Sequence, residues 1–182
     1  MSTVGLVVGN PKAQSRTLTL AEQVAAAAAG AAGLDGADRL TVDLADFGPD
    51  LFDWSSSRVE EAHDGISSCS LVVVASPTYK ASYTGLLKSF LDWFSTTDLE
   101  GVTVVPVMTG AGARHALAVE VHLRPVLVEL GATLPTRGLY VTEGELAEAD
   151  VAISTWLRAA GPQLRQAVTA GGDPSHATGA DR

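Results

Sequence analysis

Short apolar, β-branched runs alternate with helical patterns along the chain, and this alternation limits the fold to very few architectures. The runs predict strands over residues 3–8, 39–44, 70–75, 102–108 and 138–141. The intervening spacing predicts helices over residues 17–32, 57–66, 82–95, 113–130 and 145–168, the last broken near Gly161-Pro162. Such an order is typical of a parallel sheet covered by helices.

The segment Leu71-Val72-Val73-Val74 is apolar at every position, which is typical of a central strand buried on both faces. Right-handed crossovers between successive β–α units then give an open, doubly wound sheet. We therefore predict an α/β fold with a five-stranded parallel sheet and helices on both faces. Sheets of this kind bind ligands beyond the carboxyl ends of their strands. The loops after the first, third and fourth strands are thus the candidate site.

The chain of 182 residues has the length of one domain. Its 46% hydrophobic content supplies a full core and excludes wholesale disorder. The final stretch, TAGGDPSHATGADR, consists mostly of small, polar and glycine residues. We expect one domain over residues 1–168 and a disordered tail over residues 169–182.

The net charge of −9 argues against nucleic acid or an anionic membrane as a partner, because both need a basic face. The single cysteine, Cys69, excludes a disulfide framework and a multi-cysteine zinc site. The histidines have no metal-ligand spacing, so we predict no metal site. The chain has no basic leader and no apolar stretch near the ~18 residues of a membrane span. We expect a cytoplasmic protein.

The loop after the first strand, GNPKAQSRT, carries hydroxyl, amide and cationic side chains and leads directly into a helix. A helix start binds phosphate through free backbone N–H groups and its positive dipole end, and Ser15 and Thr17 can donate to phosphate oxygens. The alternative is that Ser15 or Thr17 only caps the helix. The loop is neither a Walker loop nor GxGxxG, which argues against a nucleoside triphosphate and a dinucleotide held in the Rossmann manner.

The loop after the third strand, SPTYKASYTG, combines Pro77, backbone amides expected to be free, and the ring of Tyr79. A planar heterocycle needs amides for its polar edge and an aromatic or apolar wall for its face. Alternatively, the segment is a turn that caps the next helix through Ser82 or Thr84. Capping alone leaves an exposed tyrosine and Lys80 in one tight turn unexplained.

The loop after the fourth strand, MTGAGARH, has glycines that let the backbone approach a ligand closely. These glycines could equally serve only the turn. His115, at the start of the next helix, could touch a ligand or have only a capping or surface role. Three such loops at one edge of a sheet are a stronger indication of a site than any one of them.

The order of these motifs resembles that of the flavodoxin-like NAD(P)H-dependent FMN reductase family, particularly the reductases that serve alkanesulfonate monooxygenases. The matching stretches are GNPKAQSRT, SPTYKASYTGLLKSFLDWF and PVMTGAGARHALAVEVHLRPVLVELGA, and the resemblance covers residues 4–143. It implies that FMN and a nicotinamide nucleotide bind at the three loops. The implied site residues are Asn10, Ser15, Arg16 and Thr17 for the phosphate, Pro77, Thr78, Tyr79 and Lys80 along the ring, and Thr109, Gly110, Ala111 and Gly112 on the far side, with His115 beside them.

Members of this family form dimers that often pair into tetramers, so the resemblance implies a homodimer or homotetramer. The helix over residues 82–94 and Trp93 are the implied interface contacts. This chain departs from many relatives at Ala111, where they have a second glycine. It also has Val121-His122 where some relatives carry an aromatic residue in a widened helical turn. Flavin is thus either an exchanged substrate or a resident cofactor.

The activity that the resemblance implies is hydride transfer from NADPH or NADH to FMN, with reduced flavin supplied to a partner monooxygenase. The flavin carries the electrons, so we predict no catalytic acid, base or nucleophile. One alternative is a quinone or azo-dye reductase with tightly bound FMN, and another is an electron-transfer flavoprotein. The sequence leaves open the preferred nucleotide, the natural acceptor, and the choice between dimer and tetramer.

Overall fold

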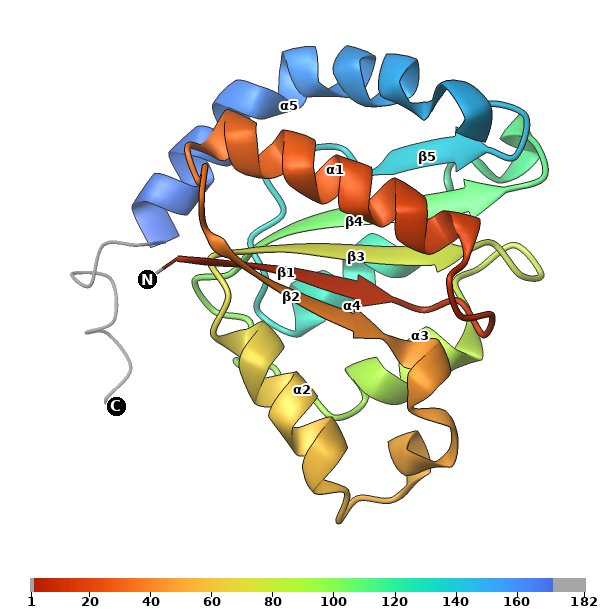
Figure 1. The fold of residues 1–182 in the computed structure, drawn as a ribbon, viewed down its shortest axis with the longest axis vertical. Helices are drawn as coiled ribbons and strands as arrows, with labels where there is room; N and C mark the ends of the chain where they lie inside the picture. Colours follow the sequence, from red (N-terminus) through yellow and green to blue (C-terminus); the bar gives the residue numbers. More distant parts are fainter. Residues whose placement is uncertain (1, 172–182) are drawn as a thin grey trace.

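The computed structural model describes residues 2–171, which form a five-stranded parallel sheet covered by helices (Figure 1). The strands are β1 (Thr3–Val8), β2 (Asp38–Asp43), β3 (Leu71–Pro77), β4 (Thr103–Gly110) and β5 (Leu139–Thr142). Their order across the sheet is β2-β1-β3-β4-β5, which confirms the predicted flavodoxin-like, doubly wound fold. The winding direction reverses between β1 and β3, so a crevice for a ligand is expected at their carboxyl ends.

The two faces of the sheet are covered by different helices (Figure 1). One face carries α1 (Arg16–Ala32) and α5 (Ala149–Gly171), and the other carries α2 (Ser57–Ser67), α3 (Gly85–Leu91) and α4 (Arg124–Glu129). Short 3-10 helices η1 (Leu44–Asp46), η2 (Gly48–Phe52), η3 (Ala113–His115) and η5 (Leu146–Glu148) and the π-helical turn η4 (Val119–Leu123) complete the connections.

The core lies on both sides of the central strands. Every residue of β3 is buried, as the apolar run predicts. On the α1 side the buried face consists largely of alanines, including Ala21, Ala25 and Ala28, whose small side chains let α1 approach the sheet closely. Each fully buried valine of the central strands contributes about 1.5–3 kcal/mol to stability. The sheet is therefore a rigid platform for the loops at its edge.

The helix predicted over residues 82–95 is wrong in length, because α3 begins at Gly85 and ends at Leu91. Lys80 and Ala81 have positive φ, which places them in a tight turn before the helix. Thr84 is extended and its side chain accepts a hydrogen bond from Leu87 N, so the helix begins only after this cap.

The helix predicted over residues 113–130 is confirmed over residues 118–129, but it begins too early and is not α-helical throughout, because η3, the π turn η4 and α4 follow one another there. Pro125 has no backbone N–H, so it cannot donate to Val121 O as an α-helix would require. The backbone widens to the π turn Val119–Leu123 immediately before this proline.

The predicted break near Gly161-Pro162 is absent, and α5 runs through both residues. Pro162 is exposed, so water can reach the Arg158 carbonyl that loses its helical partner. Gly161 is buried, and a Cβ there would lie 3.5 Å from Ala31 Cβ in α1. The helix also extends past the predicted domain end at 168, to Gly171. The rest of the predicted tail lies outside the described residues.

No helix within residues 2–171 combines the length and apolar content needed to cross a membrane. Across the same residues, His, Cys, Asp and Glu side chains form no group of three or more that could hold a metal ion.

Candidate functional site

The three predicted loops meet at the carboxyl edge of the sheet, linked by hydrogen bonds. Asn10 Nδ2 donates to Thr17 Oγ1 (3.0 Å), and the hydroxyls of Thr17 and Thr109 lie 3.4 Å apart. Thr78 N donates to Thr109 O (2.6 Å), which joins the second loop to the third. The structure thus brings together residues that are far apart in the sequence but were predicted to share one site.

The first loop forms a cradle of N–H groups at the start of α1. Gln14 has φ of 51°, a left-handed conformation that turns the chain into the helix. Ser15 Oγ accepts from Leu18 N (3.2 Å), so the capping interpretation is confirmed for Ser15. Within residues 2–171, the backbone N–H groups of Arg16 and Thr17 have no acceptor. Capping by Ser15 and anion binding by these two groups are therefore compatible.

The side chain of Arg16 pairs with a residue that follows the last strand of the sheet. Its guanidinium lies 3.3 Å from the carboxylate of Glu143, just after β5. Both side chains are exposed. Sequence reasoning found Arg16 but missed Glu143, since nothing local to Glu143 points to a distant helix start.

The second loop is a tight turn whose amides are largely occupied. Tyr79 N donates to Ser82 O (2.8 Å) and Ser82 N to Tyr79 O (3.1 Å), with Lys80 and Ala81 at positive φ between them. Because Thr78 N is also engaged, the prediction of free amides is wrong for Thr78 and Tyr79. The N–H of Lys80 alone among the three has no acceptor within the described residues. The ring of Tyr79 is 51% exposed, as expected for a ligand wall.

A buried framework fixes the second loop against the first. Thr84 Oγ1 donates to Gly9 O (2.5 Å), and Ser76 Oγ accepts from Thr84 N (3.0 Å). Thr84 also caps α3, so the capping alternative is confirmed for Thr84. Gly9 is required for this contact, because a Cβ there would lie 2.5 Å from Leu87 Cβ. The relative position of the two loops is therefore set by tight packing.

The third loop has unpaired backbone N–H groups, and a buried hydroxyl of the second loop lies beside it. The N–H groups of Ala111 and Gly112 have no acceptor among residues 2–171. Thr78 Oγ1 is buried and has no partner in the same range, and a Cβ on Gly110 would lie 3.3 Å from it. Unpaired buried hydroxyls are costly, which favours a polar group of a ligand at this position.

Tyr140 in β5 supports the third loop and was missed by sequence reasoning. Its hydroxyl donates to Gly112 O (3.0 Å) and lies 2.0 Å from the position of a Cβ on Gly110. Gly110 is thus required for close approach of the tyrosine. His115 lies half-buried in η3, and within residues 2–171 its ring forms no hydrogen bond. The geometry of the loop does not show whether His115 contacts a ligand. The predicted contact of His115 with the ligand therefore stays a prediction.

Two titratable side chains near the core have pKa values shifted by burial. Burial raises the pKa of the Cys69 thiol to about 11, and Sγ donates to Gly65 O (3.2 Å), so this cysteine is a protonated core residue. Burial also raises the pKa of Asp43, although the N–H groups of Ala45 and Gln14 act in the opposite direction. Cys69 lies away from the three loops, whereas Asp43 lies beside Gln14 of the first loop.

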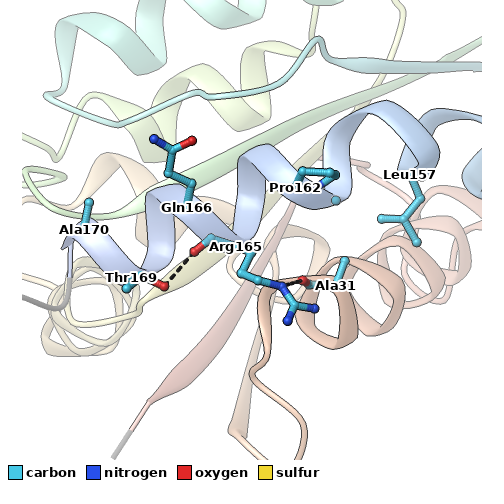
Figure 2. A pocket seen from close by; sticks show the side chains of 8 residues that line it. Ala31, Leu157, Pro162, Arg165, Gln166, Thr169 and Ala170 are labelled. Carbon is cyan, nitrogen blue, oxygen red and sulfur yellow. Dashed lines mark hydrogen bonds between the residues drawn. The ribbon is translucent and has the colours of Figure 1, made fainter.

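A hollow of about 850 Å³ lies away from the three loops, between the end of α1 and the C-terminal half of α5. Figure 2 shows that two of its polar side chains are engaged: Arg165 Nε donates to Ala31 O (3.1 Å), and Thr169 Oγ1 donates to Arg165 O (2.8 Å). Most of its wall is apolar, with Leu157 and Pro162 among the lining residues. The groups that can bind an anion and a heterocycle are at the sheet edge instead.

A family model described as NADPH-dependent FMN reductase matches residues 2–145, which contain all three loops. The chain belongs to this family. It is 34% identical to an FMN reductase (NADPH) of Pseudomonas aeruginosa over 142 residues, 76% of each chain. It is 38% identical to the NADH-dependent FMN reductase SfnF of Pseudomonas putida over 90 residues, 50% of this chain and 48% of that one.

The matched segments cover 48%, 60% and 40% of three relatives, so the chain spans about half the length of these curated proteins. Coverage is nearly complete for the apo form of the NADH:FMN oxidoreductase EmoB, a solved structure with a TM-score of 0.77 and 29% identity. That similarity spans 96% of this chain and 93% of the other. The family resemblance inferred from the loop motifs is confirmed.

Replacing Tyr140 with phenylalanine is expected to weaken FMN binding about fivefold, because loss of one hydrogen bond of ~1 kcal/mol releases Gly112 and the third loop. The measurement is a titration of FMN fluorescence. Trp156→Phe is the matched control, since it removes the bond from Trp156 Nε1 to Arg137 O (2.8 Å) at the other end of the same strand. Equal FMN affinities in Tyr140→Phe and the wild type would contradict this role for the hydroxyl.

Proposed function

We propose that this protein is an NAD(P)H-dependent FMN reductase that transfers hydride from a nicotinamide nucleotide to FMN and supplies reduced flavin to a partner monooxygenase. The observation that carries the proposal is the junction of the three loops around Thr17, Thr78 and Thr109. The relatives named NADH- and NADPH-dependent FMN reductases support it. FMN, when bound, supplies the electron-accepting ring.

The residues fit the parts of FMN in turn. The N–H groups of Arg16 and Thr17 and the hydroxyls of Ser15 and Thr17 would hold the phosphate at the positive end of α1, with Asn10 orienting Thr17. These groups form an anion site without a basic patch, which agrees with the acidic charge of the chain.

The ring would lie between the second and third loops. Pro77, Thr78, Tyr79 and Lys80 would form one wall, with the buried Thr78 hydroxyl and the Lys80 N–H as donors. Thr109, Gly110, Ala111 and Gly112 would form the other, and the open N–H groups of Ala111 and Gly112 would stabilise the negative charge gained on reduction. Hydride transfer to the flavin requires no acid or base from either wall. The role of the chain would therefore be to position the reactants and to provide hydrogen-bond donors around the ring.

We also propose that the protein assembles as a homodimer or homotetramer through an aromatic surface formed by Phe52, Trp54 and Trp93. Phe52 and Trp54 are 73% and 66% exposed, and the rings of Trp54 and Trp93 lie 4.9 Å apart. Exposed aromatic clusters are typical of protein interfaces. Trp93 lies beyond the end of α3 and donates to Leu51 O (3.1 Å). Light scattering on the purified protein gives the number of subunits.

A cytoplasmic location is proposed with this activity, because reduced nicotinamide nucleotides are supplied there.

The test of function is the consumption of NADPH and NADH in air, with and without added FMN. Consumption that rises and saturates with FMN supports the proposal. Rapid consumption without added FMN would instead favour a quinone or dye reductase with resident flavin. Binding of FMN without consumption of either nucleotide would favour an electron carrier.

A further inference from the structure

An exposed ion pair joins Arg16, at the start of α1, to Glu143, just after β5. Arg16 is the first residue of α1, and its guanidinium is 3.3 Å from the Glu143 carboxylate. The backbone N–H of Glu143 donates to Gly110 O (2.8 Å), so the residue is anchored to the third loop. The backbone of Glu143 is thereby fixed beside the third loop, and its carboxylate pairs with the first residue of α1.

This arrangement weakens the field that a phosphate would meet. The start of α1 attracts anions through its N–H groups, and a free arginine there would strengthen the attraction. The nearest arginine is already paired with a carboxylate. Glu143 also adds a negative charge on the side of the first residue of α1, and like charges at an exposed site repel one another modestly.

We propose that Glu143 lowers the affinity of the protein for FMN by pairing with Arg16. This inference rests on the proposed function, because it requires the FMN phosphate at the first loop. It assigns an effect on flavin affinity to an exposed residue that follows β5. Within residues 2–171, its polar contacts with the predicted site are the ion pair with Arg16 and the bond to Gly110 O.

The decisive variant is Glu143→Gln, which keeps the size of the side chain and the backbone bond to Gly110 but removes the charge. FMN should bind about fivefold more tightly, since an exposed ion pair and a nearby like charge each change affinity by a small factor. Riboflavin has no phosphate, so its affinity should not change. The gain for FMN should shrink as salt is added. Both affinities are measured by flavin fluorescence without turnover.

Variants of the partner complete a double-mutant cycle. Arg16→Gln alone should weaken FMN binding, because it leaves the Glu143 charge unpaired beside the phosphate. The double variant should bind FMN about as the wild type does, since both charges are gone. Glu148→Gln is the matched control, because it removes an equal charge from an exposed residue of η5 and should leave FMN affinity unchanged.

Unchanged FMN affinity in Glu143→Gln would overturn the inference, and so would an equal gain for riboflavin, which would place the effect on the ring. The phosphate site that the proposed function requires is tested separately in the same titration, by whether wild-type protein binds FMN more tightly than riboflavin, and the reductase activity itself is tested by nucleotide consumption. If the wild type prefers FMN to riboflavin but Glu143→Gln does not change FMN affinity, the phosphate site is supported and only the role of Glu143 is contradicted.

Discussion

Thr17→Glu should abolish FMN binding, with a loss of at least about a hundredfold in affinity. Thr17 is only 3% exposed and its hydroxyl lies between Asn10 and Thr109, so a carboxylate there would face the phosphate at close range. Two like charges about 4 Å apart repel by about 4 kcal/mol near a protein surface. Fluorescence titration with FMN measures the loss, and circular dichroism establishes that the variant is folded.

Two further variants separate this effect from damage to the fold. Ala26→Glu adds the same charge to an exposed position of α1, far from its first turn, and should leave FMN affinity unchanged. Thr17→Val keeps the shape of the side chain and removes only the hydroxyl, so its affinity should fall about fivefold. Wild-type affinity in a folded Thr17→Glu protein would show that the phosphate lies elsewhere.

Gly9→Ala should have the largest effect on stability. The added Cβ would lie 2.5 Å from Leu87 Cβ and 3.3 Å from Leu87 Cα, so α3 must move away from the end of β1. Overpacking of this kind costs about 1–3 kcal/mol. The movement would also disturb the bond from Thr84 Oγ1 to Gly9 O, so FMN affinity should fall together with the melting temperature.

Thermal unfolding measures this change, and a loss of ~2 kcal/mol lowers Tm by about 4–8 °C in a domain of this size. Gly85→Ala is the control, because a Cβ at Gly85, the first residue of α3, has no heavy atom within 4 Å. It should leave Tm equal or slightly higher, since alanine favours a helix. An unchanged Tm in Gly9→Ala would show that α3 moves away from β1 without a loss of stability, which would contradict the prediction.

Sequence periodicity determined the architecture and the location of the site. The apolar run of β3 and the alternation of strand and helix patterns require a parallel sheet, and parallel strands bring their carboxyl ends to one edge. The three loops could therefore be placed together before any contact was known. The contacts among Asn10, Thr17 and Thr109 agree with that placement.

Tertiary structure alone decided how the groups of the site are used. The amides of Thr78 and Tyr79 are occupied by Thr109 and by a turn, and Arg16 is paired with Glu143. The hydrogen bond from the Tyr140 hydroxyl to Gly112 O, which supports the third loop, likewise cannot be predicted from the pattern of residues in a strand. Periodicity reports which face of an element is buried, because burial repeats with the geometry of the backbone. It does not show which distant residue accepts a hydrogen bond from a given donor, since that depends on how separate elements pack.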